Sequence, residues 1–208
     1  MRVLVTGHWG FVGGHLCKRL GNVVGIDLKD GNDILTADLP QVDRVYHLAA
    51  NTDAQSPDVA ADARVNIMGT LRLLEAYGDR LVFASSSMVS YPTTPYGISK
   101  LAGEKYCRMY GAGVVRFCNL FGEGGHSVID RFREGRGVIR GSGSQVRTYA
   151  PVEAAVDALL SVKPGELVVL PGKDMTVNDV AAMYAGEHPR EPAGALDMED
   201  GRQVMSWA

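Results

Sequence analysis

The sequence predicts an α/β protein built on a doubly wound parallel sheet, followed by a small C-terminal lobe. Two observations predict this class. Short, valine-rich apolar runs recur through the first 120 residues, and segments of helix length with one apolar stripe lie between them. Strands that are buried on both faces give such uninterrupted runs. Alternation of strand and helix implies right-handed crossovers within one sheet.

The elements follow one another in a regular order. The predicted strands are Val3–Val5, Val23–Ile26, Val45–Leu48, Leu81–Phe83 and Val114–Phe117, and the predicted helices are Phe11–Leu20, Val59–Tyr77 and Tyr96–Tyr110. After Leu120 we expect a helix over Pro151–Val162, a strand over Leu167–Leu170 and a helix capped by Thr176 or Asn178. This gives a first domain over residues 1–120 and a lobe over residues 121–208 that is not an independent domain.

Length, charge and cysteine content narrow the function classes. The 208 residues, 46% hydrophobic and 22% charged, fit one globular domain. A formal net charge of −3 argues against an electrostatic nucleic-acid binder, and no apolar stretch is long enough to span a membrane. Three distant cysteines suggest neither a disulfide framework nor a metal site. We expect a cytoplasmic protein with a small-molecule partner, no bound metal, no nucleic acid and no membrane.

The clearest motif is glycine-rich and follows the first predicted strand. Gly7, Gly10 and Gly13 open the first predicted helix, in the segment TGHWGFVG. Such glycines allow a sharp turn, close approach of the backbone to a pyrophosphate, and tight packing of the helix on the sheet. Asp27 ends the second strand, where a carboxylate binds a ribose 2′-hydroxyl and repels a 2′-phosphate. A glycine-rich turn can be purely structural, but with Asp27 it predicts a Rossmann-type site that prefers NAD.

A second polar cluster follows the fourth predicted strand. The serines Ser85–Ser87 end that strand, and Tyr96 and Lys100 are one helical turn apart on the next helix. An ammonium group beside a phenol lowers the phenol pKa, so Lys100 is expected to make Tyr96 a usable base while a serine holds the substrate oxygen. The same spacing also occurs on ordinary exposed helices. Its position in a dinucleotide-binding fold favours catalysis.

These motifs resemble the extended short-chain dehydrogenase/reductases, in particular the NAD-dependent epimerase/dehydratase group that acts on nucleotide sugars. The resemblance runs from Met1 to about Met183. Four further segments carry it: HLAA at 47–50, NxxGT at 66–70, RxxNxxG at 116–122 and GxGxQxR at 141–147. It implies NAD as cofactor, a nucleotide sugar as substrate, and a homodimer formed through the helix that bears Tyr96 and the helix before the serine strand.

The resemblance also implies roles for individual residues. Ser86, Tyr96 and Lys100 would be catalytic, with Ser87 as the alternative serine and otherwise a substrate contact. Asn119 and Arg147 would approach the diphosphate of the substrate, and Asp38 would read the adenine. The residues expected to contact the cofactor are Gly7, Trp9, Gly10, Phe11, Val12, Gly13, Asp27, Asp38, Leu39, Leu48, Ala49, Ala50, Asn66, Ser85, Tyr96 and Lys100.

The chain departs from the family pattern at three places. Met88 stands where dehydratases and decarboxylases of the family carry an acid, so epimerisation or ketone reduction fits better than elimination. Only ten residues separate Ser86 from Tyr96, which shortens the loop over the substrate. The C-terminal lobe is small. Either the substrate is small or loosely held, or a partner subunit completes the site, or the activity is vestigial.

Three functions follow from these features. The expected one is NAD-dependent epimerisation of a nucleotide sugar, through transient hydride transfer to bound NAD. The alternatives are an NAD(P)-dependent reductase or dehydrogenase of a sugar nucleotide or small ketone, and a non-catalytic NAD-binding regulatory module. The intact serine, tyrosine and lysine favour an enzyme.

Overall fold

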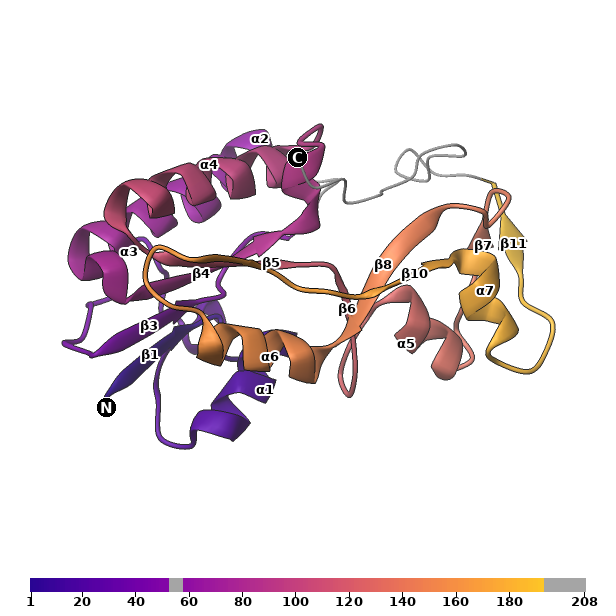
Figure 1. The fold of residues 1–208 in the computed structure, drawn as a ribbon, viewed down its shortest axis with the longest axis horizontal. Helices are drawn as coiled ribbons and strands as arrows, with labels where there is room; N and C mark the ends of the chain where they lie inside the picture. Colours follow the sequence, from indigo (N-terminus) through magenta and orange to yellow (C-terminus); the bar gives the residue numbers. More distant parts are fainter. Residues whose placement is uncertain (53–57, 193–208) are drawn as a thin grey trace. The chain divides into compact units, whose positions relative to one another are not determined.

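Figure 1 shows the computed structural model of the chain, which describes residues 1–52 and 58–192. The chain divides into two compact units. Unit 1 comprises Met1–Phe117 and Glu153–Leu170, and unit 2 comprises Cys118–Val152 and the chain from Pro171 onward. Residues 193–208 of the predicted C-terminal lobe lie outside the described part.

Unit 1 is built on a six-stranded sheet in which all neighbouring strands are parallel. In spatial order the strands are β2 (Val24–Ile26), β1 (Val3–Thr6), β3 (Arg44–His47), β4 (Leu81–Ser86), β5 (Gly113–Phe117) and β9 (Leu167–Val169). The chain goes from β1 outward to β2 and then crosses to β3 on the other side. Ligands of such sheets bind at the carboxyl ends of the strands beside this reversal. The predicted doubly wound parallel sheet is confirmed.

Helices cover both faces of this sheet, with α3 and α4 on one face and α1 and α6 on the other (Figure 1). Their bounds are Phe11–Leu20 for α1, Gly69–Tyr77 for α3, Pro95–Tyr110 for α4 and Val152–Ser161 for α6. Alternate strand residues point to opposite faces. Leu4 therefore lies in the core under α3 and α4, whereas Val3 and Val5 lie in the core with α1 and α6. Burial on both faces explains the uninterrupted apolar runs.

The predicted helix over Val59–Tyr77 is continuous but changes type along its length. It begins as α2 (Val59–Asp62), continues as a π-helical segment, η2 (Ala63–Met68), and ends as α3. π-helical segments are rare and occur often at functional sites. Here the segment contains Asn66, which is buried.

The crossover from β2 to β3 contains no α-helix. After a 3-10 turn, η1 (Leu28–Asp30), the chain runs along α3, where the guanidinium of Arg72 binds the carbonyl oxygens of Ile34 and Ala37. A crossover helix would normally cover this part of the core. Here the buried side chain of Ile34 covers it instead. The other 3-10 turns of unit 1 are η3 (Gly78–Arg80) and η4 (Ser87–Ser90).

Unit 2 has its own core, to which Ile129, Phe132, Tyr149 and Val180 contribute. One sheet consists of β10 (Lys173–Thr176), β8 (Val146–Pro151) and β6 (Asn119–Phe121), and the other of β7 (Ile139–Arg140) and β11 (Arg190–Glu191). Strand β8 is antiparallel to β10 and parallel to β6. The helices α5 (Val128–Arg133) and α7 (Val177–Ala182) each start with a capping box, at Ser127 and Thr176.

The division predicted at residue 120 differs from the structure. The chain leaves unit 1 after Phe117, but α6 and β9 return to it. Leu159 of α6 packs in the core of unit 1, and β9 pairs with β5 through Val168 and Val115. The sequence pattern identifies this helix and strand correctly, but it does not show which sheet an isolated strand joins.

Candidate functional site

The turn between β1 and α1 contains the three glycines of the predicted cofactor site. Gly7 has a φ of 73°, and a Cβ atom there would lie 2.7 Å from the backbone nitrogen of Ala49. A Cβ atom on Gly13 would lie 2.1 Å from the carbonyl oxygen of Gly7, so α1 approaches the turn only because residue 13 has no side chain. Gly10 precedes α1, and no side chain caps its first N–H groups. Uncapped N–H groups at a helix N-terminus are suited to bind phosphate.

Hydrogen bonds connect this turn to the end of β2. The carboxylate of Asp27 accepts bonds from the backbone N–H groups of Trp9 and Lys29, each at 3.0 Å. Asp30 accepts a bond from the indole N–H of Trp9 at 2.7 Å and pairs with His8 at 3.0 Å. Asp27 and Trp9 therefore lie together beside the glycine turn, and the indole remains 58% exposed.

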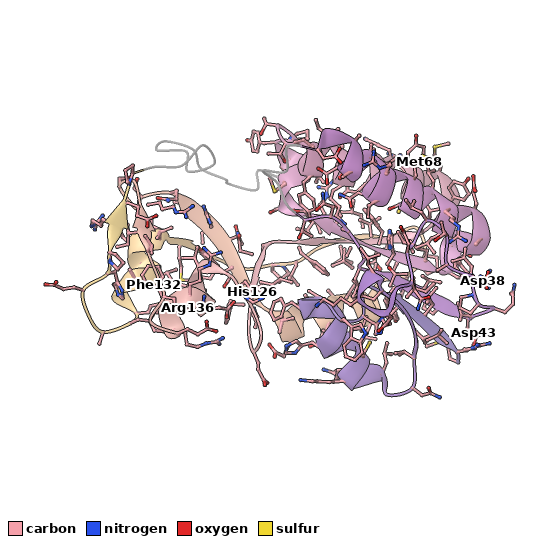
Figure 2. The ribbon with its side chains drawn as sticks, turned by 180° about the vertical axis from the view of Figure 1, so that it is seen from behind. Asp38, Asp43, Met68, His126, Phe132 and Arg136 are labelled. Atoms are coloured by element: carbon pink, nitrogen blue, oxygen red, sulfur yellow. The ribbon has the colours of Figure 1, made fainter. Side chains whose placement is uncertain are left out.

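Asp38, predicted to read the adenine, and Leu39, a predicted cofactor contact, lie on the crossover from β2 to β3. The carbonyl oxygen of Pro40 accepts a bond from Tyr77, the last residue of α3, which lies near the amino ends of the strands. Figure 2 shows Asp38 near Asp43, whose carboxylate binds the N–H of Arg2 before β1. The short crossover from β2 has already left the carboxyl edge at this point. Asp38 is exposed, and Leu39 packs against the core.

The segment after β3, which contains the predicted cofactor contacts Leu48, Ala49 and Ala50, lies beside the glycine turn. The N–H of Leu48 donates to the carbonyl oxygen of Thr6 at 3.1 Å, and the N–H of Ala49 donates to the Thr6 hydroxyl at 3.2 Å. The backbone of Ala49 faces Gly7. The predicted contacts Phe11 and Val12 form the first turn of α1, at the same edge of the sheet.

The predicted catalytic residues come together at the carboxyl end of β4. Ser86 is the last residue of this strand, and Tyr96 lies in the first turn of α4. Hydrogen bonding from the Ser86 side chain acts to lower the pKa of Tyr96, and the Ser86 hydroxyl accepts a bond from the N–H of Met88 at 3.2 Å. Ser87 begins the following turn, η4. The geometry therefore favours Ser86 over Ser87 as the partner of Tyr96.

Lys100 is buried where α4 packs on β4. Its ammonium group donates to the carbonyl oxygen of Ala84 at 2.9 Å. The Nζ atom lies 4.8 Å from the ring centre of Phe83 and 5.7 Å from that of Tyr96. Burial lowers the pKa of Lys100 to about 8, because desolvation disfavours the charged form.

The pKa of Tyr96 differs from the expectation that Lys100 lowers it. Burial raises the pKa of Tyr96 to about 12; the hydrogen bond with Ser86 opposes this shift, and the negative charge of Asp62 adds to it. Desolvation is the largest cause of this shift. In this structure Tyr96 is therefore a protonated phenol at neutral pH.

Asn66 connects the segment after β3 to α4. Its side-chain oxygen accepts a bond from the N–H of Asn51 at 2.8 Å, and its amide group donates to Ser99 at 2.9 Å. Ser99 donates in turn to the carbonyl oxygen of Tyr96 at 2.8 Å. Ser99 and Asp62 are absent from the sequence-based prediction. The available signal was helical spacing, since they lie three residues from Tyr96 and four residues from Asn66.

Ser85 has a structural partner. Its hydroxyl donates to Glu104, whose carboxylate also accepts two bonds of 2.7 Å from the guanidinium of Arg116. Ser85 and Glu104 are buried, so the carboxylate is paired as burial requires. The Ser85 hydroxyl is therefore directed to α4, and any contact of this residue with a cofactor would involve its backbone.

Asn119 and Arg147, the two residues predicted to approach the diphosphate, lie in unit 2 on neighbouring strands. Asn119 begins β6 and donates from its side chain to the carbonyl oxygen of Thr148 at 3.0 Å. Arg147 lies on β8 and lines a cavity of about 150 Å³. The other arginines that line the cavity are Arg131, Arg136 and Arg140. Glu191 also lines it and pairs with Arg140, and Arg136 pairs with Glu134. The arginines still outnumber the carboxylates in the lining, which suits a phosphorylated ligand.

The sequence matches a known family over most of its length. The model of the NAD dependent epimerase/dehydratase family covers residues 3–164. The chain belongs to this family. It is 31% identical to an uncharacterized UDP-glucose epimerase of Bacillus subtilis (strain 168), over 84% of this chain and 78% of the relative. It is 33% identical to the UDP-glucose 4-epimerase of Mycolicibacterium smegmatis, over 77% and 72% of the two chains.

Solved structures of the same fold support this assignment. MoeE5, in complex with UDP-glucose and NAD, has a TM-score of 0.81 at 27% identity, over 93% of this chain and 86% of that one. The UDP-glucuronic acid 4-epimerase of Bacillus cereus, in complex with UDP-glucuronic acid and NAD, has a TM-score of 0.80 at 26% identity, over 95% and 87%. The alignment with the Bacillus subtilis relative is 245 residues long but includes only 84% of this 208-residue chain. That relative therefore has internal residues that this chain lacks.

Proposed function

We propose that the chain catalyses the NAD-dependent epimerisation of a nucleotide sugar. The observation that carries the proposal is the grouping of three residues at the carboxyl edge of the sheet. Ser86 ends β4, Tyr96 lies in the first turn of α4, and Lys100 lies beside the tyrosine ring. At the same edge, β1 ends in the glycine turn. Relatives named as UDP-glucose 4-epimerases support it. Met88, in place of an acid, fits this reaction better than elimination.

The β1–α1 turn fits a dinucleotide. Side chains are excluded at Gly7 and Gly13, and the uncapped N-terminus of α1 would bind the pyrophosphate, with Asp27 at the adenosine ribose. When bound, NAD supplies an acceptor for the hydride that leaves the sugar carbon and returns to its opposite face. The cofactor is unchanged after one cycle.

Three side chains handle the proton that accompanies this hydride. As a phenolate, Tyr96 takes it from the sugar hydroxyl while the hydride leaves the same carbon, and the resulting phenol gives it back when the ketone is reduced. Ser86 holds the reacting oxygen by a hydrogen bond. Because the pKa of Tyr96 is raised to about 12, its phenolate needs positive charge nearby, and the ammonium group of Lys100 supplies it.

The arginine-lined cavity of unit 2 supports a nucleotide diphosphate as the constant part of the substrate. A diphosphate carries at least two negative charges, and guanidinium groups bind phosphate through paired hydrogen bonds. Of the four arginines that line the cavity, Arg147 is the one in the GxGxQxR motif, and Asn119 lies on the adjacent strand. We assign both to the diphosphate.

We further propose a cytoplasmic homodimer. Ile98 and Met109 on α4 are 54% and 76% exposed, and such apolar side chains on one long helix suit a helix-to-helix interface. Leu74 of α3 is buried in the core instead.

The three cysteines are free thiols, which suits a reducing compartment. No helix within residues 1–52 and 58–192 is long and apolar enough to cross a membrane. Light scattering on the purified protein tests the dimer.

Turnover of UDP-glucose and UDP-glucuronic acid tests the proposed reaction. We expect the wild type to convert one of them to its epimer without net formation of NADH. Tyr96→Phe is expected to lower kcat by about 10³-fold, because the phenol no longer transfers a proton, while NAD stays bound. Tyr110→Phe, at the end of α4, is the matched control and keeps full activity.

Three outcomes would decide against the proposal. Full activity of Tyr96→Phe would remove the phenol from the mechanism. Stoichiometric consumption of NADH with a keto sugar would assign a reductase. A protein that binds NAD but turns over no nucleotide sugar would be the non-catalytic module.

A further inference from the structure

His47 is fully buried in unit 1, and the mechanism above does not use it. The imidazole lies at the end of β3, between Thr6 of β1 and Thr70 of α3. Its Nδ1 atom is 2.8 Å from the Thr6 hydroxyl, and its Nε2 atom is 2.9 Å from the Thr70 hydroxyl. Both threonines are fully buried as well. The ring therefore connects the strand before the glycine turn to the helix after Asn66.

The neighbours fix the direction of each hydrogen bond. The Thr70 hydroxyl is 2.6 Å from the carbonyl oxygen of Asn66, which can only accept, so Thr70 donates its single hydrogen there. Thr70 must then accept from His47, which places a hydrogen on Nε2. In a neutral ring Nδ1 is an acceptor and takes the hydrogen of Thr6, whose oxygen accepts from the N–H of Ala49. Every group on this path has a partner.

The surroundings keep the ring neutral. Burial lowers the pKa of His47 to about 3, and the positive charge of Lys100 on α4 acts in the same direction. The ring of Phe83 on β4 lies 5.7 Å away, centre to centre, and offers no charge. With the hydrogen on Nε2, every donor and acceptor between the N–H of Ala49 and the carbonyl oxygen of Asn66 has a hydrogen-bond partner.

We propose that His47 is a positioning residue, a permanently neutral bridge between the glycine turn and the proton-transfer site. At one end the bridge reaches Ala49, whose backbone lies against Gly7. At the other end it reaches Asn66, which holds Ser99 and through it the backbone of Tyr96. The catalytic consequence rests on the proposed function, whereas the bonding pattern does not.

Nitrogen NMR of histidine-labelled protein tests the bridge without cofactor or substrate. Between pH 5 and 8.5 we expect one imidazole with a hydrogen on Nε2 and a bare Nδ1, unchanged over this range. His126 is exposed and serves as the internal control for a histidine outside the core. The signal is assigned by its loss in His47→Gln; if that chain does not fold, Thr70→Val identifies it by a shift. A titrating ring, or a hydrogen on Nδ1, overturns the proposal.

Kinetics of Thr70→Val test whether the bridge positions the site. This change keeps the shape of the side chain but removes the acceptor of His47 and the bond to Asn66. We expect kcat to fall about tenfold while KM for the nucleotide sugar stays within about twofold. The control is Leu74→Ala on the same helix, which creates a core cavity and leaves both constants within about twofold.

Each result is decisive. An unchanged kcat in Thr70→Val, or an equal fall in Leu74→Ala, removes the positioning role. If the wild type turns over no nucleotide sugar, the proposed function fails, and the NMR result still decides whether the neutral bridge exists.

Discussion

The glycine turn after β1 and the tyrosine site after β4 lie on the same edge of one sheet, with β3 between their strands, but they are built in opposite ways. The turn depends on the absence of side chains at Gly7 and Gly13. Backbone atoms lie within 3 Å of the position that a Cβ atom would take at either residue. The tyrosine site is shaped by polar side chains whose burial shifts the pKa values of Tyr96 and Lys100. Substitutions in the turn should therefore act through steric overlap at any pH, whereas substitutions at the tyrosine site should act through charge.

The largest effect is expected from a methyl group in the turn. In Gly13→Ala the new Cβ atom overlaps the carbonyl oxygen of Gly7, which is backbone and cannot move without opening the turn. NAD affinity should fall at least about 100-fold, or about 2.7 kcal/mol. Gly14→Ala is the matched control, because its Cβ atom meets nothing within 4 Å. That variant should keep its affinity and gain up to about 1 kcal/mol of stability from helix propensity. Calorimetric titration with NAD compares them, and equal affinities would contradict the steric account.

The second effect concerns the ion pair beneath the tyrosine site. Glu104→Gln leaves the guanidinium of Arg116 without its anion in a largely buried position, which should cost about 3–5 kcal/mol of unfolding free energy. Asp157→Asn, which breaks an exposed pair with Arg19, should cost less than about 1 kcal/mol. Urea unfolding measures both. Similar losses would show that burial does not distinguish the two pairs.

The third effect is a pH dependence of stability caused by Lys100. Its pKa is about 8 in the folded chain and 10.5 in the unfolded chain. Between these values the unfolded chain binds more protons, so stability should rise with pH from about 8 toward 10. At pH 7 the buried ammonium group then costs about 3 kcal/mol, at about 1.4 kcal/mol per pKa unit. Lys100→Met should be more stable at pH 7, lack this rise and lose turnover. A wild type with stability independent of pH over this range would contradict the burial of a charged lysine.

The smallest effect is expected from the charge of Asp62. In Asp62→Asn the negative charge that raises the pKa of Tyr96 is removed, so that pKa should fall. Because Tyr96 must lose its proton to act as the base, the limb on which kcat rises with pH should move to lower pH, by less than about one unit. Asp79→Asn, an exposed position in η3, should leave the profile in place. An unmoved profile in Asp62→Asn would assign Asp62 a purely structural role.

Local patterns predicted much of the fold and of the site. Valine-rich runs identified the strands of the sheet, because burial on both faces leaves no alternation. The bounds predicted for α1 are those of the structure, and Thr176, one of two proposed caps, begins α7. Helical spacing brought Tyr96 and Lys100 to one site, and the serine next to the phenol is Ser86.

Features that depend on distant contacts were not accessible from the sequence. Asp38 was assigned to the adenine by a family motif alone, and neither helical nor strand periodicity fixes its place in the short crossover before β3. The direction of the pKa shift of Tyr96 depends on how deeply the phenol is buried and on Asp62 from another helix. Ser85 and Ser86 are adjacent on β4, so their side chains point to opposite faces of the sheet. A run of three serines does not show which of them faces α4 and therefore bonds to Glu104.

Unit 1 is formed by two separate segments of the chain, which affects how it folds during synthesis. The first 117 residues contain five of the six strands, but β9 and α6 complete the sheet only after unit 2 has begun. During synthesis β5 remains an open edge, and the apolar surface that Val156 and Leu159 later cover stays exposed. A fragment ending near residue 120 should therefore associate with itself, whereas one that continues through Leu170 carries the segments that close its own sheet.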